Sequence, residues 1–555
     1  MSGDRLPASR AEWRIAAIVA GAIVVVFAVF RLALVWRFPP FYDEALYALW
    51  TVEGFQNPDL RFVSMQTADE PLFTWLGMGI MWLGAGALTA VRLGSAVCGL
   101  VTLVLCGLLG RELGGWRAGL AAAGIAAILP FFVVHDVIGI TDPLATTLVT
   151  AGLYVQIRLA RRPSLAGAIL LGLALGGGLL TKPTTYVAIA LIPFSLLLFD
   201  WSPAGRARRL ATWLGCVALA LVLAYTLYSI MKLSPFWEEF VRYRAQHGAA
   251  ASQSAHSIGT GLDTPGKWIG RNWPVYRSEL TGYLTIPVIL AAAAGLGLGL
   301  RRSPRLAGLI GLWLVAPLVI VLLLTEVQYP RYILVGMPPV VVLAGYGSVC
   351  ALDWVRGRSW GQGPTLAALV ALAAVVVLPA LVFDGRVLAS PSTAHYPGLD
   401  DLQYVTGGPA LKPYETIAGD LRARAANNGL VVALGDFTSD YWKLEFRDDP
   451  SVSFVRIDAP EACSALFAVE TQVPLPRRAD GMSWREVQVY PRPRRGMPTT
   501  LYESGVVVNG RFVSTPDELR AAIGGSDRDY DAFGASRPCV RAWLESFAGS
   551  TLAPS

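Results

Sequence analysis

The stretch "RIAAIVAGAIVVVFAVFRLALVWRFPPFYDEALYALW" (residues 14–50) joins a long apolar run to a pair of adjacent acids. The run, 15–36, has the ~20 apolar residues that a helix needs to cross a lipid bilayer. Arginines precede it, and because Lys and Arg are enriched on the cytoplasmic side of membrane proteins, they predict a cytoplasmic N-terminus. Asp43 and Glu44 then emerge at the outer surface. We expect Arg31, inside the run, to extend its side chain toward that surface.

The composition of the whole chain agrees with a membrane protein. Of its 555 residues, 54% are hydrophobic and only 15% are charged, whereas soluble domains carry about 25% charged residues. The net charge of +6 comes from short clusters between apolar runs. This pattern is typical of loops that set membrane topology and argues against a nucleic-acid partner. The cysteines and histidines show no zinc-site spacing.

The stretch "PLFTWLGMGIMWLGAGAL" (71–88) decides the topology, because its assignment reverses the side of every later loop. If it does not cross, the loops "RELGGWR", "RLARRPS", "DWSPAGRARR", "RRSPR" and "WVRGRSWGQG" are cytoplasmic, and all of them are basic. We therefore expect 71–88 to be a surface-lying or re-entrant helix, and the chain to have about eleven spans with an outside C-terminus. After 15–36, the predicted spans are 89–110, 116–134, 142–160, 164–180, 184–199, 210–232, 282–300, 306–325, 332–354 and 364–383.

The sequence thus predicts a polytopic α-helical membrane domain over 1–383, with outer loops 37–88 and 233–281, followed by a domain over 384–555. The second domain alternates helix-like and strand-like segments, which predicts a small α/β fold outside the cytoplasm. We expect helices at 413–429 and 439–446, strands at 430–436, 452–458 and 465–471, and a loop at "PRPRR" (491–495). Cys463 and Cys539 could form a disulfide in an oxidising compartment, and free thiols are the open alternative.

The acids of the outer face are the candidates for catalysis. If "DEALYALW" is helical, Asp43 and Tyr47 share a face, and a partly buried carboxylate can act as a general base. For Glu44, a catalytic role and a solvated juxtamembrane role are equally open. His135, Asp136 and Asp142 lie at the outer ends of consecutive spans, where Asp142 could alternatively be an N-cap followed by Pro143. Together with Asp43 they could bind a divalent metal.

Cations also occur in the predicted outer loops, against the charge rule. Lys182 lies in "LLTKPTTY" and Arg331 in "YPRYILVG", next to Tyr329 and Tyr332. Because Arg binds phosphate bidentately and Lys acts as a point charge, this pair could form a phosphate clamp, unless both residues merely anchor span ends at the interface. The loop 233–281 adds further cations, of which we take Arg242 and Arg271 as additional phosphate ligands.

A series of short motifs occurs in a characteristic order. The motifs are "YDEALYALW", "EPLFTWL", "AVRLGSAVCGL", "ITDPLA", "GLLTKPTTY" and "YPRYILVGMPPVVVLAGYG". Over about residues 10–350, the series resembles the GT-C membrane glycosyltransferases of the protein O-mannosyltransferase and aminoarabinose-transferase type. The segment "AHYPGLDDLQYVTGGPA" (394–410) resembles bacterial members that have an outer C-terminal domain.

The resemblance implies an inverting glycosyltransferase that moves a sugar, hexosyl or pentosyl, from a polyprenyl phosphate to an acceptor hydroxyl. Asp43 matches the family's general base, Asp142 matches its second acid, and Lys182 and Arg331 match segments near the donor phosphate. Many relatives have Lys-Pro-Pro-Leu where this chain has Asp69-Glu70-Pro71-Leu72. The replacement of a lysine by an acid favours a metal bridging Asp69 or Glu70 to the phosphate.

The predicted sites can be grouped by role. Catalysis is assigned to Asp43, Glu44 and Asp142; donor phosphate binding to Lys182, Arg331, Tyr332, Arg242 and Arg271; acceptor contacts or their support to Tyr47, His135 and Asp136; and a metal, if one is used, to Asp43, Asp69, Glu70 and Asp142. The expected partners are the lipid-linked donor, a protein, lipid or glycan acceptor, and the lipids of the cell membrane. The alternatives are a polytopic transporter or lipid flippase, and a non-catalytic membrane protein whose outer domain binds a partner.

Overall fold

The computed structural model describes residues 9–247, 258–358, 360–425, 430–435, 439–471, 475, 479–524 and 526–549. The chain divides into two compact units. The first consists of Met1–Phe38, Trp50–Pro391 and Tyr396–Leu399, and the second of Pro39–Leu49, Ser392–His395 and Asp400–Ser555. The second unit therefore includes a short N-terminal segment as well as the C-terminal part of the chain.

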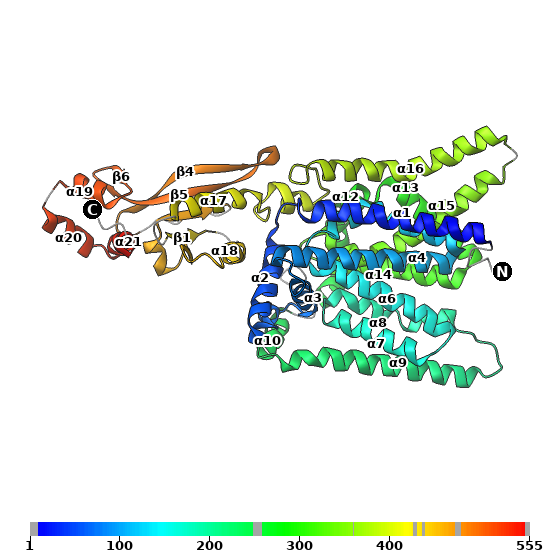
Figure 1. Ribbon diagram of the computed structural model, residues 1–555. Coiled ribbons are helices and arrows are strands. Elements are labelled where there is room, and N and C mark those ends of the chain that lie inside the picture. The colour runs from blue at the N-terminus through cyan, green and yellow to red at the C-terminus, as the bar shows by residue number, and fades with distance from the viewer. Residues whose placement is uncertain are drawn as a thin grey trace. The chain divides into compact units, whose positions relative to one another are not determined.

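The first unit is a bundle of long apolar helices, several of which run beside one another in Figure 1. Among the described residues, 6 helices are long and apolar enough to cross a membrane, or up to 7 if a pair bent by 97° counts as one span. The bent pair is α12 (Pro265–Leu284) and α13 (Ile286–Arg302). The other long helices are α1 (Arg10–Val35), α4 (Ala87–Ile128), α6 (Thr141–Arg161), α7 (Leu165–Leu179), α9 (Arg206–Tyr228), α14 (Pro304–Leu324), α15 (Met337–Arg356) and α16 (Gln362–Ala389). The protein is thus a multi-pass membrane protein.

Helix α4 contains a sharp reversal of the chain direction. This reversal accounts for part of the difference between the 6 or 7 long helices and the eleven predicted spans. Gly114 and Gly115 leave the helical conformation, and Gly115 has a φ of 81°, which favours glycine. Gly107 on one side of the reversal packs against Gly119 and Ala123 on the other. The halves of α4 are therefore antiparallel neighbours, as predicted for the separate spans 89–110 and 116–134.

Shorter apolar elements account for other predicted spans. Helix α7 packs in parallel with α9, because Gly172 lies against Leu223 and Gly176 against Leu227. The chain must return between two parallel neighbours, and it does so through the irregular segment 183–198. This segment consists of η3 (Pro183–Thr185), α8 (Tyr186–Ala190) and η4 (Pro193–Leu198).

The ambiguous stretch 71–88 contains only α3 (Leu72–Met81), a helix of 10 residues. At ~1.5 Å per residue, such a helix is too short to cross a bilayer, as expected. In Figure 1, α3 and α10 (Trp237–His247) lie at one end of the bundle. The remaining elements of the first unit are η1 (Pro58–Leu60), η2 (Val63–Thr67), α5 (Pro130–His135), η5 (Ser229–Leu233), α11 (Ile258–Asp263) and η6 (Pro330–Gly336), and α2 (Tyr42–Gln56) begins in the second unit and continues into the first.

Ion pairs join the loops that were predicted to be cytoplasmic. Glu112 accepts from both Arg158 and Arg161, and Arg117 lies 2.8 Å from Asp353. Loops after three different helices therefore meet at one end of the bundle. Three of the five basic loops gather there, at the end of α6 opposite to Asp142.

The second unit contains a mixed sheet with strand order β2-β1-β3-β5-β4, and β6 pairs with β5. Helices α17 and α18 form a core with the sheet through Tyr414, Trp442 and Leu501. The predicted helices and strands between 413 and 471 are confirmed within the described residues. The elements are η7 (Leu402–Thr406), α17 (Lys412–Ala425), β1 (Leu430–Leu434), α18 (Ser439–Glu445), β2 (Val452–Arg456), η8 (Pro460–Ser464), β3 (Phe467–Glu470), β4 (Met482–Arg492), η9 (Pro493–Arg495), β5 (Gly496–Val508), β6 (Arg511–Val513), α19 (Pro516–Ile523), α20 (Asp527–Ala535) and α21 (Pro538–Gly549).

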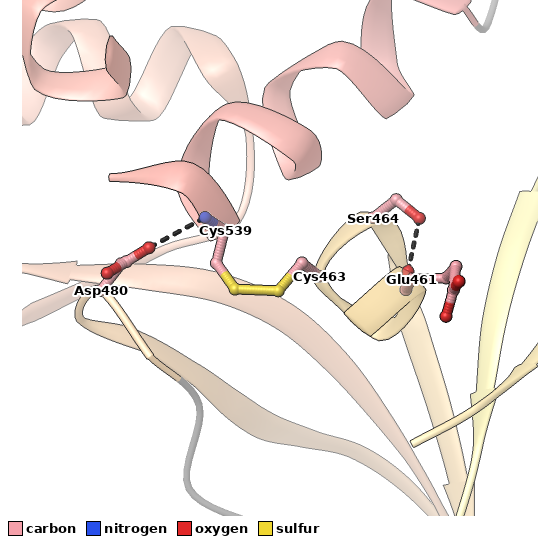
Figure 2. The surroundings of a disulfide bond; sticks show 5 residues. All are labelled: Glu461, Cys463, Ser464, Asp480 and Cys539. Atoms are coloured by element: carbon pink, nitrogen blue, oxygen red, sulfur yellow. Dashed lines mark hydrogen bonds between the residues drawn. A yellow bond between two sulfur atoms is a disulfide. The ribbon is translucent and has the colours of Figure 1, made fainter. Parts of the chain in front are cut away.

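A disulfide joins Cys463 in η8 to Cys539 in α21, across 76 residues of sequence (Figure 2). The backbone N–H of Cys539 also donates to the carboxylate of Asp480 at 2.8 Å. The bond ties the C-terminal helix to the segment that connects β2 and β3. Of the alternatives that the sequence left open for this pair, the disulfide is the one found.

Candidate active site

Lys182 and Asp142 form an ion pair at the end of α6 opposite to Arg158 and Arg161. Asp142 lies in the first turn of α6, and Lys182 follows the end of α7 and precedes η3. The Lys182 Nζ lies 2.7 Å from the Asp142 Oδ1. The lysine side chain keeps 21% of its surface exposed and the aspartate only 6%. The aspartate is therefore held within the protein, while the lysine ammonium remains accessible to a ligand.

Arg331 joins this pair through the tyrosines beside it. The Lys182 Nζ lies 5.1 Å from the centre of the Tyr332 ring, and the Arg331 guanidinium lies 5.8 Å from the same ring. The guanidinium also lies 4.3 Å from the Tyr329 ring. These are distances typical of cation–π contacts, which fix a cation without neutralising it. We name Asp142, Lys182, Arg331 and Tyr332 the outer cation cluster, after the side of the membrane on which the sequence analysis predicts them.

Two of the alternatives that the sequence left open do not describe the structure: the N-cap role of Asp142 and the surface-anchor role of Arg331. The N-cap of α6 is Ile140 rather than Asp142, and no side chain caps the helix. Arg331 is buried, with 6% of its surface exposed, so it does not extend along the membrane surface as a simple anchor would. The predicted pairing of Lys182 with Arg331 and Tyr332 is what the helix bundle brings together.

A second ion pair, between Glu70 and Arg244, lies close to this cluster. The N–H of Leu72 donates to the Leu180 carbonyl at 2.9 Å. Glu70 is two residues before Leu72, and Lys182 is two residues after Leu180, so this hydrogen bond links the segments that carry them. Glu70 is buried and accepts from Arg244 of α10. Burial raises the pKa of Glu70 to about 7, although the charge of Arg244 opposes this shift.

Arg244 is a cation of the loop 233–281 that the sequence analysis did not select as a phosphate ligand. We selected Arg242 and Arg271 from the loop 233–281 instead, and both are exposed. Arg271 donates to the Glu326 carbonyl at 2.7 Å and lies over the Trp268 ring. The helical period of α10 offered the missing signal: Phe240 and Arg244 are four residues apart, and the Arg244 guanidinium lies 4.5 Å from the Phe240 ring.

Asp136 and His135 lie in a closed environment rather than an open site. Arg31 donates to the Asp136 carboxylate at 3.0 Å, and both side chains are almost completely buried. The same guanidinium donates to the Ala126 and Ala127 carbonyls at the end of α4. The expectation that Arg31 reaches toward the outer surface is therefore wrong, because a carboxylate and unpaired helix-end carbonyls satisfy it internally.

His135 is also fully buried. Its Nδ1 lies 2.8 Å from the Phe131 carbonyl, and its ring stacks on Phe131 and meets Tyr283 edge-on. Direct contact of His135 or Asp136 with an acceptor would require this packing to open. Their surroundings favour a role in holding the loop before Asp142.

The acidic pair occupies the first turn of α2, so the predicted helix over "DEALYALW" is confirmed. Asp43 is half-buried, Glu44 is fully buried, and Tyr47 is 8% exposed. Negative side chains in a first turn are stabilised by the N-terminal end of the helix dipole. This turn clusters with the second unit, while α2 from Trp50 onward clusters with the first.

The carboxylates considered as metal ligands do not assemble into a metal site. Glu70 pairs with Arg244, and Asp142 pairs with Lys182, so each already has a cationic neighbour. Within the part of the chain that the structure describes, no group of 3 or more His, Cys, Asp or Glu side chains could hold a metal ion.

Comparisons with known proteins agree with the resemblance in the sequence. Residues 68–229 match the family model described as dolichyl-phosphate-mannose-protein mannosyltransferase. No curated protein sequence matches the chain significantly.

The fold is similar to that of solved membrane glycosyltransferases. ArnT from Cupriavidus metallidurans in the apo state matches with a TM-score of 0.56 and 18% identity, over 89% of this chain and 98% of that chain. The same protein bound to undecaprenyl phosphate matches with a TM-score of 0.54 and 17% identity over the same shares. The archaeal oligosaccharyltransferase AglB from Archaeoglobus fulgidus, in complex with an inhibitory peptide and a dolichol-phosphate, matches with a TM-score of 0.52 and 12% identity, over 83% and 70%. The chain therefore has the fold of the GT-C membrane glycosyltransferases, as its sequence motifs predicted.

Proposed function

We propose that the protein is an inverting glycosyltransferase that moves a sugar from a polyprenyl phosphate to an acceptor hydroxyl at the outer face of the membrane. The observation that carries the proposal is the outer cation cluster. Lys182 and Arg331 contact one tyrosine ring, and Asp142 holds the lysine. Two cations with limited exposure beside a membrane interface suit a lipid phosphate, which is anionic and anchored at that level.

The cluster has the chemistry that a phosphate leaving group needs. The Lys182 ammonium has three donors, so it can keep its bond to Asp142 and still donate to a phosphate oxygen. The Arg331 guanidinium can bind phosphate through two parallel hydrogen bonds. Because these cations are already oriented, they stabilise the charge that develops as the phosphate departs.

Asp43 is the general base in this proposal. The acceptor oxygen attacks the anomeric carbon of the sugar and forms the new C–O bond, while the bond from that carbon to the phosphate oxygen breaks. The acceptor proton passes to the Asp43 carboxylate, and the electron pair of the broken bond leaves with the polyprenyl phosphate. Glu44 adjoins the base, and its complete burial favours a role in orienting the turn.

Arg244 is a further candidate for the donor phosphate. Its partner Glu70 has a pKa raised to about 7, so near neutral pH that carboxylate is only partly ionised. The positive charge of Arg244 is then incompletely balanced. This arrangement adds to the positive potential near Lys182 without requiring a metal.

Several features support an outer location for this chemistry in the cell membrane. The disulfide between Cys463 and Cys539 favours an oxidising compartment for the second unit. The basic loops lie at the end of the bundle opposite the cluster, which favours a cytoplasmic N-terminus. The relatives described above include one bound to undecaprenyl phosphate and one with a dolichol-phosphate and a peptide. A lipid-linked hexose or pentose donor, and a protein, lipid or glycan acceptor, are proposed here on that likeness.

The test is a transfer assay with the purified protein in lipid nanodiscs. A panel of radiolabelled polyprenyl-phosphate hexoses and pentoses is offered with solubilised envelope components as the acceptor source. We expect label transfer with one donor, and a loss of at least 100-fold in Asp43→Asn, since general-base help is typically worth ~10²–10⁴ in rate. Donor binding by Asp43→Asn should be retained. Lipid translocation without any glycosidic transfer would replace the proposal with the flippase alternative.

A further inference from the structure

The segment that carries Asp43 is built into the fold of the second unit. Phe41 pairs with Ala410 in an antiparallel bridge. The N–H of Tyr42 donates to the Pro409 carbonyl at 3.1 Å, and the N–H of Leu411 donates to the Pro40 carbonyl at 3.0 Å. These hydrogen bonds fix where the chain stops being extended and where α2 begins.

The first N–H groups of a helix have no partner within the helix and are usually satisfied by a capping side chain or water. At the start of α2, a backbone carbonyl from residue 409 takes this role. The bond sets the first turn of α2 in position, and Asp43 is the residue directly after the donor. A shift of the 408–411 segment would therefore shift the carboxylate.

Side chains reinforce this attachment. Ala45, one turn into α2, belongs to the same hydrophobic core as Tyr414 and Trp442. The Phe41 ring meets the Tyr404 ring edge-on with centres 5.2 Å apart. A change in the core of the second unit would therefore remove packing contacts that hold the start of α2 in position.

Arg492 holds the other side of the 408–411 segment. Its side chain is 3% exposed. It donates to the Ala410 carbonyl at 3.2 and 3.1 Å, to the Gly408 carbonyl at 3.4 Å, and to the Met497 carbonyl. Arg492 is the last residue of β4, and Met497 lies at the start of β5. The guanidinium therefore links the tip of the β4–β5 hairpin to the carbonyls on both sides of Pro409.

We propose that the second unit positions the catalytic base, and that Arg492 is the positioning residue through which the β4–β5 hairpin fixes the 408–411 segment and with it the first turn of α2. This inference rests on the proposed function of Asp43. If the inference holds, the C-terminal domain contributes to the chemical step by positioning Asp43. The alternative function of this domain is to bind the acceptor.

The first experiment measures the position of the turn without any substrate. Hydrogen exchange of the amides in residues 42–46 is compared among the full-length wild type, Arg492→Met and Arg492→Lys. The matched control is Arg485→Met, which removes an exposed arginine of the same strand that pairs with Glu503 at 2.7 Å. We expect exchange in 42–46 to accelerate at least tenfold in Arg492→Met, less in Arg492→Lys, and not in Arg485→Met. Equal exchange in Arg492→Met and wild type would overturn the inference.

The second experiment uses donor turnover by the same variants. Because a misplacement of ~1 Å can cost about 10²-fold in rate, kcat should fall between about tenfold and 100-fold in Arg492→Met. The KM for the donor and the pH profile should not change, since the donor cations and the base are intact. A rise in the acceptor KM at constant kcat would favour acceptor binding instead. If the wild type transfers no sugar, the proposed function fails, and the exchange experiment still decides the attachment.

A rescue separates positioning from misfolding. Residues 41 and 410 form a pair of the type whose Cα atoms lie ~4.5 Å apart, which suits a disulfide. Phe41→Cys with Ala410→Cys, oxidised in the Arg492→Met background, should restore slow exchange and most of kcat. Arg492→Met alone is carried through the same oxidation and reduction, since reduction also opens Cys463–Cys539. Failure of the cross-link to recover kcat while it restores slow exchange would contradict the positioning role.

Discussion

The ion pairs Lys182–Asp142 and Arg31–Asp136 both join neighbouring helices, but their surroundings differ. In the first, the lysine side chain is 21% exposed and the aspartate 6%. In the second, the corresponding values are 1% and 4%. Arg31 also donates to backbone carbonyls at the end of α4, whereas Lys182 faces the ring of Tyr332.

The difference indicates a division of labour. A buried pair whose arginine is bonded to a carboxylate and to backbone carbonyls is not accessible to a ligand, and it stabilises the loop that leads from α5 to α6. A pair with an exposed lysine and a neighbouring guanidinium can exchange a contact for a phosphate oxygen. Substitution of each cation should therefore affect a different property.

The largest effect is expected from Arg31→Met. The substitution leaves the buried Asp136 carboxylate without its cation, and breaking a buried pair costs about 3–5 kcal/mol. Thermal unfolding in detergent should show this loss. Arg31→Met combined with Asp136→Leu should regain most of the stability, because no buried charge remains. An unchanged unfolding temperature in the single variant would show that the pair is not sealed.

Lys182→Met should act on the reaction instead. We expect kcat/KM for the donor to fall by about 100-fold, which corresponds to ~2.7 kcal/mol. The loss of stability should be smaller than in Arg31→Met, because the 21% exposed lysine leaves a path for water to the site. Lys182→Arg should keep part of the activity. If Lys182→Met unfolds the protein and does not specifically reduce sugar transfer, the Lys182–Asp142 pair has a structural role like that of Arg31–Asp136.

The Glu70–Arg244 pair sharpens the comparison through pH. The folded-state pKa of Glu70 is raised from 4.5 to about 7, so the folded protein binds this proton more tightly than the unfolded chain does. Stability from this group is therefore complete below pH 4.5 and is lost as the pH rises through 7. Because one pKa unit corresponds to ~1.4 kcal/mol, the change over this whole range should be on the order of 3 kcal/mol. Unfolding temperatures measured across this range should slope less in Glu70→Gln than in wild type. Parallel slopes would contradict the assignment.

The smallest effect is expected at the basic end of the bundle. Glu112 pairs there with Arg158 and Arg161, whose side chains are 58% and 25% exposed. Glu112→Gln should lower stability by ~1 kcal/mol or less and leave transfer unchanged. A drop in kcat/KM for this variant would mean that the two ends of the bundle are coupled.

The sequence predicted the outer cation cluster because apolar spans and polar loops alternate regularly along the chain. Alternation of spans predicts that Asp142, Lys182 and Arg331 lie at one face of the membrane, and the charge rule predicts that this is the outer face. The same reasoning could not locate Arg244, because the path of the loop before it depends on packing. It also mistook the environment of Arg31, since the carbonyls that satisfy it belong to residues about 95 positions away in the chain.

The second unit shows a similar limit. Its helices and strands up to 471 followed from local patterns. The strands β4 and β5 were missed, although the loop predicted at "PRPRR" contains the turn between them, η9. Pro491 lies in β4, an edge strand, where proline is tolerated. The attachment of residues 39–49 to this unit left no local signal, since it arises from a backbone bridge and side-chain contacts between segments far apart in the sequence.

The central claim is that the outer cation cluster binds a lipid phosphate. Its most direct test is the binding of undecaprenyl phosphate to the wild type and to Arg331→Gln in nanodiscs, measured by native mass spectrometry. The account predicts that the wild type binds and that the variant binds at least tenfold more weakly, while Arg271→Gln binds like the wild type. Equal affinity of the wild type and Arg331→Gln would contradict it.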